Sequence, residues 1–433
     1  MGRVLRSATV SLAAVSVLVT AGCGSDSQVT DIYSSGGWPA AHGDARNSDG
    51  SAVTGSRATS LAWSRPLGAP TSTHASIAST GQVFATTHSD NGCNLWSFQM
   101  ESGRKRWCTR LGPGVSSSTP IVDRATNVYV GEDGAMNSFN EHGQLRWRTV
   151  VSGTPISAQF TGDGNLLFVT QFGIVSVLSP QTGKEIVPSY QLIPAPTVDQ
   201  AENVPLPPAA LGLDQCVTGS PACPVGGVPA IDLASGRFYL TVWRPGRPQA
   251  DLVAMRYGDG ALTEDWSSDA IPGGTTATPV LSADGTTVYV YDRSGALWAL
   301  DAATGQPRWH HDLGFPAVGT PSVSPDGVIA AAGSGDGRLT GLRDRGDHAE
   351  VVWERKDLVQ LGVPAQTAGG TGYTVVRDGT DRLAALTFDT ATGATVDQDV
   401  LPGATGVSVG TSIGPDGEVL VSTLIGELFV LKP

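Results

Sequence analysis

The chain has 433 residues and a formal net charge of −13, with 55 Gly, 28 Pro and only 15% charged residues. A chain rich in Gly, Pro and Thr but poor in Lys and Glu forms helices poorly, so the composition argues against a coiled coil and a helical bundle. Its 40% hydrophobic content argues against a disordered chain. Its negative charge argues against a surface that binds nucleic acid. The composition therefore favours strands and tight turns.

The first 22 residues have the pattern of a secretory signal peptide. Two arginines precede an apolar stretch, 8–19, that is too short to span a bilayer comfortably, and small residues follow it. The ending Thr-Ala-Gly-Cys23 resembles the lipobox of bacterial lipoproteins, which implies cleavage before Cys23 and lipidation of its side chain. An ordinary signal peptide beside an incidental cysteine is the alternative. We expect residues 23–37 to form a flexible tether that links the protein to the extracytoplasmic face of the cell membrane.

Four further cysteines are an even number, which in an exported protein predicts two disulfides. We expect Cys93 to pair with Cys108, because the two flank a predicted hairpin. We expect Cys216 to pair with Cys223 inside a Pro-rich insertion at about 188–229. Zinc is the alternative for these cysteines, but the sequence lacks a Cys-x-x-Cys pair and histidine is scarce nearby. The insertion is either functional or decorative.

A short apolar strand, often of the form Leu-x-x-Leu, recurs eight times along the chain, in most copies after a turn with Gly. Six of the seven spacings between the copies are 39 to 45 residues, and the longer spacing contains the insertion. Such a period, with four strands and tight turns per unit, is the signature of a β-propeller blade. We therefore predict an all-β fold, an eight-bladed β-propeller of four-stranded antiparallel blades over residues 38–433. We expect this ring to be a monomer.

Only seven of the eight repeats are followed by a complete outer strand. The segment 61–67 resembles the missing strand, with Trp63 in the position of the recurring Trp, and it lies before the first blade. We expect this segment to close the ring by completing the last blade, because closure protects exposed strand edges. A leader loop is the alternative for Trp63.

The stretch Thr304-Gly305-x-x-x-Trp309 resembles the repeat of the pyrroloquinoline-quinone (PQQ)-like propeller family. Residues 38–46 (WPAAHGDAR) resemble the segment by which that family's chain approaches the first blade. In the family, the recurring tryptophans dock one blade against the next. Repeats three and seven depart from the pattern, since Val187 and Asp397 stand where the Trp is expected. The residues to which the resemblance gives this structural docking role are Trp63, Trp107, Trp147, Trp266, Trp309 and Trp353.

One functional implication of the resemblance is a quinoprotein dehydrogenase. Such an enzyme would bind PQQ and calcium, use a catalytic Asp and commonly carry a vicinal disulfide. The chain has no Cys-Cys pair and no dense Asp-x-Asp-x-Asp calcium loop. His310 and His311 are adjacent, so on a strand they point to opposite faces and do not form a metal site. We therefore expect no catalytic residue, no metal and no cofactor.

The other implication is a scaffold without catalysis. A propeller with a lipid anchor is similar in architecture to the propeller lipoprotein of the outer-membrane β-barrel assembly machinery, which implies an envelope protein as partner. A binding propeller that uses its central funnel or the insertion is a related interpretation. We expect a protein- or ligand-binding scaffold, with a PQQ- and calcium-dependent oxidoreductase as the alternative.

Overall fold

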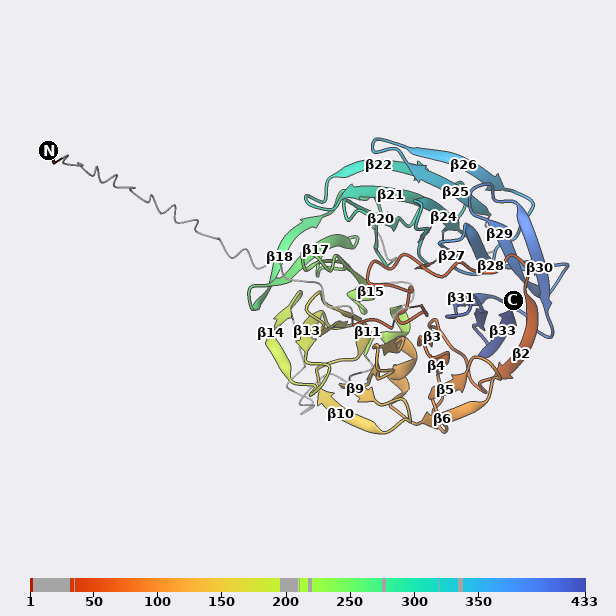
Figure 1. Ribbon diagram of the computed structural model, residues 1–433, viewed down its shortest axis with the longest axis horizontal. Helices are drawn as coiled ribbons and strands as arrows, with labels where there is room; N and C mark the ends of the chain where they lie inside the picture. The colour runs from red at the N-terminus through yellow and green to blue at the C-terminus, as the bar shows by residue number, and fades with distance from the viewer. Residues whose placement is uncertain are drawn as a thin grey trace.

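The structure, a computed structural model, consists of eight sheets arranged as blades of a ring around a central axis (Figure 1). Each blade has four antiparallel strands, so the predicted eight-bladed all-β propeller is confirmed. In the described part of the chain the helices are short 3₁₀ turns, η1 (Pro113–Ser117) and η3 (Leu213–Gln215). None of the described helices has the length and apolar character needed to cross a membrane. The described residues are 1–2, 32–34, 36–194, 209, 211–216, 220–274, 278–317, 319–333 and 338–433.

The first four blades follow the chain from the axis outward. Blade 1 contains β3 (Ser76–Ile77), β4 (Gln82–Thr86), β5 (Leu95–Gln99) and β6 (Lys105–Thr109). Blade 2 contains β7 (Ile121–Val122), β8 (Val128–Glu132), β9 (Ala135–Phe139) and β10 (Leu145–Val150). Blade 3 contains β11 (Pro155–Phe160), β12 (Leu166–Thr170), β13 (Ile174–Leu178) and β14 (Glu185–Gln191). Blade 4 contains β15 (Val225–Ile231), β16 (Arg237–Val242), β17 (Asp251–Gly258) and β18 (Ala261–Ser268).

The last four blades repeat this order, with two additions from the N-terminal part of the chain. Blade 5 contains β19 (Val280–Leu281), β20 (Thr287–Tyr291), β21 (Ala296–Asp301) and β22 (Pro307–Asp312). Blade 6 contains β23 (Ser322–Val323), β24 (Val328–Ala332), β25 (Leu339–Asp344) and β26 (Ala349–Arg355). Blade 7 contains β27 (Ala365–Thr367), β28 (Thr371–Asp378), β29 (Arg382–Asp389) and β30 (Thr395–Leu401), with β1 (Gly50–Ser51) added inside it. Blade 8 contains β31 (Ser408–Ile413), β32 (Val419–Thr423), β33 (Glu427–Lys432) and β2 (Ser60–Pro66).

The position of a strand within its blade decides its residue pattern. The second strands, such as β8 and β12, are buried along their whole length. The outer strands are mostly exposed: β10 buries Trp147 but leaves Leu145 and Val150 exposed to solvent. Buried strands carry few charged side chains, and the one in β8, Glu132, is paired with Arg148 at 2.8 Å. The low charge of the chain follows from the number of such strands.

Ring closure uses the N-terminal strand. β2 pairs antiparallel with β33 from Ser60 opposite Lys432 to Pro66 opposite Glu427. Figure 1 shows β2 on the outside of the ring beside β33 and the C-terminus. The prediction that the segment 61–67 completes the last blade is therefore confirmed.

The outer-strand tryptophans lie at the junctions between blades. The indole Nε1 of Trp63 donates to the Met100 carbonyl at 2.7 Å, and a Cβ added at Gly103 would lie 2.6 Å from the Trp63 ring. Gly103 has a φ of +64°, the left-handed conformation that glycine adopts without strain. Trp309 differs in that its Nε1 donates to the Asp344 carboxylate at 2.8 Å. The indole–glycine contact recurs between Trp107 and Gly143, Trp147 and Gly183, Trp266 and Gly305, and Trp353 and Gly393.

A β-bulge accompanies each junction residue. In β2 the register shifts between Leu61 and Trp63. An extra residue in the strand increases its twist and re-aims the following side chain, here toward the next blade. The same shift occurs beside Val187 in β14 and beside Asp397 in β30. Val187 is buried, and Asp397 accepts a hydrogen bond from the Thr59 N–H at 2.9 Å, so blades 3 and 7 keep the bulge without the indole.

The insertion is shorter than the sequence suggested. β14 extends to Gln191 and β15 begins at Val225, so the connection covers 192–224 instead of 188–229. Pro188 belongs to the outer strand β14 and not to the loop. Proline is tolerated at a sheet edge because it needs no backbone N–H to pair with a neighbouring strand.

The packed part of the chain also starts earlier than expected. Tyr33, which the sequence placed in a flexible tether, packs edge-on against Phe160 with ring centroids 5.2 Å apart. Its hydroxyl donates to the Gln159 side chain at 2.7 Å. An aromatic side chain with a hydrogen-bonding tip can be fixed on the ring in this way even within a polar segment.

The structure joins the same cysteines that the sequence pairs. Cys93 and Cys108 flank the β5–β6 hairpin with Cα atoms 5.7 Å apart. Cys216 and Cys223 are joined just before β15 with Cα atoms 5.0 Å apart. Cys23, the expected lipidation site, lies outside the described residues.

Candidate functional site

A segment that precedes the first blade lies inside the ring. Residues 36–54, called here the axial segment, run around the central axis, and Figure 1 shows this part of the chain crossing the middle of the ring before it reaches β2. β1, within this segment, pairs in parallel with β27. The axial segment is hydrogen-bonded to the innermost strands of seven consecutive blades. The bonded pairs, in blade order, are Trp38 with Ile77, Pro39 with Val122, Asp44 with Gln159, Ala45 with Ile231, Arg46 with Leu281, Ser48 with Val323 and Asp49 with Gln366.

The Asn47 side chain joins the axial segment to three separate parts of the ring. It is fully buried, with a φ of +58°, a left-handed conformation that Asn tolerates better than most residues. Its amide nitrogen donates to the carbonyls of Val228 at 3.0 Å and Pro279 at 3.1 Å. Its amide oxygen accepts from Gln159 Nε2 at 2.8 Å. One side chain thereby links blades 3 and 4 to Pro279, the residue that precedes the first strand of blade 5.

A cavity of about 760 Å³ borders the axial segment. Its other walls are Tyr33, Ser34 and the turns between the first and second strands of blades 4 to 7. Two charged groups at the wall, Asp44 and Arg46, form an ion pair of 2.9 Å. Burial alone would raise the pKa of Asp284, but hydrogen bonds from Ser282 and Thr286 outweigh it and hold this pKa below its ordinary value. Asp284 is therefore an ionised turn residue at neutral pH and a poor proton donor.

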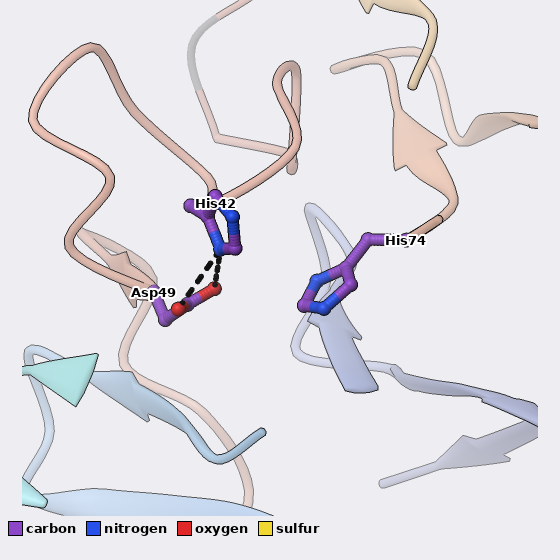
Figure 2. Close-up of side chains that lie close together, drawn as sticks. All are labelled: His42, Asp49 and His74. Atoms are coloured by element: carbon purple, nitrogen blue, oxygen red, sulfur yellow. Dashed lines mark hydrogen bonds and ion pairs between the residues drawn. The ribbon is translucent and has the colours of Figure 1, made fainter. Parts of the chain in front are cut away.

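The side chains of His42, Asp49 and His74, all of a kind that can bind a metal, lie close together (Figure 2). His74 precedes β3, so this cluster lies at the ends of the innermost strands that are farther from the cavity. His42 Nδ1 lies 3.0 and 3.1 Å from the two carboxylate oxygens of Asp49. The rings of His42 and His74 are edge-on, with centroids 5.2 Å apart. The ligand atoms of all three residues lie within 4.8 Å of one another. The three residues are only 9%, 0% and 7% exposed, so this His–Asp–His cluster is shielded from solvent.

His74 occupies a slot that fits an imidazole ring. It lies against Gly410 in β31, where an added Cβ would come within 2.4 Å of its Cε1 and Nε2 atoms. One ring nitrogen donates to the Val409 backbone, whereas Nδ1 has no hydrogen-bond partner among the described residues. Burial is the largest influence on His74 and lowers its pKa from 6.5 to about 4. The ring is therefore neutral at neutral pH, with one unprotonated nitrogen inside the protein.

The cluster does not fit the calcium ion of a quinoprotein. Calcium takes roughly six to eight oxygen ligands, whereas two of the three donors in this cluster are imidazole nitrogens. Within the described ranges, this is the one group of three such side chains close enough to share an ion. No step of quinone chemistry is therefore assigned to these residues.

Comparison with known families assigns the chain to a family. The family model described as outer membrane protein assembly factor BamB matches residues 48–204 and 225–425, which is more than half of the chain. The chain belongs to the BamB family. The two matched stretches are separated at the Pro-rich connection between blades 3 and 4.

Relatives of this BamB-family chain differ in how much of it they cover. A Mycobacterium tuberculosis protein, Protein Rv3035, is 38% identical over 417 residues, which cover 95% of this chain and 100% of that protein. Outer membrane protein assembly factor BamB of Yersinia pestis is 25% identical over 293 residues, which cover 67% of this chain and 65% of that protein.

Two solved structures share the ring architecture of this BamB-family chain. BamB from Moraxella catarrhalis matches with a TM-score of 0.53 at 15% identity, covering 87% of this chain and 100% of that one. Quinohemoprotein alcohol dehydrogenase from Comamonas testosteroni matches with a TM-score of 0.64 at 13% identity, covering 93% of this chain and 81% of that one. At these identities the two matches show the fold alone.

The His–Asp–His cluster of this BamB-family chain was not expected from the sequence. His42 and Asp49 are seven positions apart in a segment without helical or strand periodicity, and His74 belongs to another element. The adjacent pair His310–His311, which the sequence argues against as a metal site, lies on β22, where His310 stacks on Trp298 with ring centroids 4.6 Å apart. The available signal was the placement of two of the seven histidines among small and apolar residues.

Proposed function

We propose that this protein is a lipid-anchored, extracytoplasmic scaffold that binds an envelope protein partner and catalyses no reaction. The axial segment is the observation that carries this proposal. Propeller enzymes assemble their sites from separate blades near the axis, and here the protein's own chain is hydrogen-bonded to seven blades at that place. The name of the matching family, an assembly factor, supports a role exerted through protein contacts.

The anchor would also orient the ring. The Ile32 carbonyl accepts a hydrogen bond from Arg124 in the turn between β7 and β8, nine residues after Cys23. Nine residues span at most about 30–32 Å. Lipidation of Cys23 would therefore hold the face formed by first-to-second-strand turns toward the membrane. The opposite face, formed by second-to-third-strand turns, would be available to a partner.

The lipid anchor predicts a simple change in fractionation. In Cys23→Ser the protein is expected to leave the membrane fraction, because two acyl chains provide stable attachment and none would be added. Mass spectrometry of the membrane form of the wild type should find the diacylglyceryl group on Cys23. Ser25→Ala is the control and should remain in the membrane fraction. An unmodified Cys23 in the membrane-bound wild type would contradict this part of the proposal.

An exposed apolar patch on the opposite face is a candidate contact surface. Leu424 and Ile425, in the turn between β32 and β33, are 45% and 51% exposed, and Val407 is 39% exposed. The Leu424 N–H donates to the Val407 carbonyl at 3.0 Å, so these residues form one continuous surface. Clustered exposed apolar residues are typical of sites where another protein binds. This patch fits an envelope protein with an apolar contact of its own.

Crosslinking and affinity purification from intact cells test the scaffold proposal. The double variant Leu424→Ser/Ile425→Ser is expected to recover a specific partner about 10–100-fold less efficiently, since each apolar side chain contributes roughly 1.5 kcal/mol or more when buried. The matched control is Leu145→Ser/Val150→Ser, which changes two exposed apolar residues on the outer strand β10. Equal recovery with both variants, or the absence of any specific crosslink to the wild type, would refute the proposal.

A further inference from the structure

We propose that His42, Asp49 and His74 bind one divalent transition-metal ion of the zinc class, which fastens the axial segment to the ring. The three ligands are not residues of the apolar patch proposed for a partner. The site also differs in donor chemistry from the calcium site that the quinoprotein alternative would require. Its role would be structural.

The donor set suits zinc. Two imidazole nitrogens and one carboxylate oxygen are a common protein ligand set for zinc, and a fourth position is left for water. Ligand atoms on a tetrahedral zinc ion lie about 3.4 Å apart. His42 Nδ1 and the Asp49 oxygens are already 3.0 and 3.1 Å apart. Because all the ligand atoms lie within 4.8 Å of one another, binding needs a small approach of the His74 ring. It also needs the release of the proton that His42 Nδ1 shares with Asp49, as metal binding by protonated ligands does.

The surroundings hold the ligands in the orientation that a metal requires. The Val409 backbone accepts a hydrogen bond from one His74 ring nitrogen, whereas Nδ1 has no hydrogen-bond partner among the described residues. The Thr320 hydroxyl donates to Asp49 Oδ2. Such outer hydrogen bonds fix the tautomer of a ligating histidine and the position of a ligating carboxylate. A buried nitrogen without a partner is unusual in proteins, and a bound cation would supply that partner.

The three ligands come from parts of the molecule that the sequence keeps apart. His42 and Asp49 flank the bend of the axial segment, and His74 precedes the innermost strand of blade 1. Figure 2 shows the His74 ring facing His42 and Asp49 from a separate segment. Gly410, from blade 8, provides the space for that ring. A shared ion would therefore cross-link the axial segment to the wall near the place where the ring closes.

The test uses the full chain, purified in detergent with a histidine-free tag and stripped with a chelator. Titration with Zn²⁺ alone should give one ion per chain. The melting temperature should rise by about 3–5 °C when free zinc is 100-fold above its Kd. His74→Gln and His42→Gln should each weaken binding by more than the ~10–100-fold that the loss of an outer partner costs. His142→Gln, at an exposed histidine, is the matched control and should bind as the wild type does.

A structural readout accompanies the titration. Zinc should slow amide hydrogen exchange in residues 38–51 of the wild type and of His142→Gln, but not of His74→Gln. Two single-ligand variants are included so that the failure of one to fold still leaves the other informative. The proposal is overturned if the wild type binds no stoichiometric zinc, if both ligand variants bind it normally, or if calcium binds there in preference. In the first case the cluster would be a hydrogen-bonded network alone.

Discussion

Replacing Trp63 with alanine is expected to lower the free energy of unfolding by about 3–5 kcal/mol, the usual cost of removing a buried Trp side chain. The indole is 9% exposed, fills the junction between blades 8 and 1, and donates to the Met100 carbonyl. Its removal leaves a cavity at the place where the ring closes. Denaturant unfolding followed by intrinsic fluorescence and circular dichroism would measure the loss.

Trp243→Ala is the control for this change, because Trp243 is partly exposed and its Nε1 bonds within its own loop to the Arg247 carbonyl at 3.1 Å. Trp243→Ala should lower the free energy of unfolding much less than Trp63→Ala does.

A second pair of variants isolates the contact at the junction. Gly103→Ala should cost about 2–4 kcal/mol, because it combines a strained φ with a clash against Trp63. Gly346→Ala, with a φ of +92° but open space around it, carries the strain alone. Equal losses for the two glycine variants would show that the junction is not tightly packed.

Asn47→Ala is expected to cost about 3–5 kcal/mol, because it removes three buried hydrogen bonds and leaves their partners unsatisfied. The effect should be concentrated at the axis. Hydrogen exchange should accelerate in the axial segment and in the innermost strands of blades 3 and 4, to which Asn47 is bonded. Limited proteolysis should cut the variant within residues 36–54, while the wild type resists cleavage there.

Two controls separate the causes of that loss. Asn47→Gly also removes the amide, but glycine adopts the left-handed conformation without strain. It should therefore lose less free energy of unfolding than Asn47→Ala, and the difference between the two measures the strain of alanine at this φ. Asn140→Ala changes an asparagine in a surface turn of blade 2 and should cost about 1 kcal/mol or less. If Asn47→Ala were no worse than Asn140→Ala, the axial segment would not contribute to the stability of the ring.

Much of the fold was predictable because a blade is a local unit. Strand–turn–strand patterns depend on residues close together in the chain, and eight copies of one pattern reinforce each other. The count of outer strands, together with the position of Trp63, was enough to assign the closing strand. The substitutions in blades 3 and 7 were visible as well, because Val187 and Asp397 stand at the Trp position. The bulges beside these residues were not predictable, because they depend on the pairing register.

The interior of the ring was not predictable, because its contacts join residues far apart in sequence. Asn47 bonds residues more than a hundred positions away, and no local pattern indicates such bonds. The slot for His74 depends on Gly410, a strand glycine without a turn signal. The residues 38–46 were identified only by resemblance to a family segment. Their course around the axis became evident only with the structure.

The pairing of β2 with β33 has a consequence for how the protein folds. The two strands lie roughly 360–370 residues apart in the chain, so their ladder carries one of the largest loop-closure entropies in the molecule. The closing strand is made early in synthesis and has no partner until the last strand follows. Seven blades can fold while the eighth presents an open edge, a state prone to mispairing with other chains. Completion of the final blade is therefore expected to be the slow step of folding.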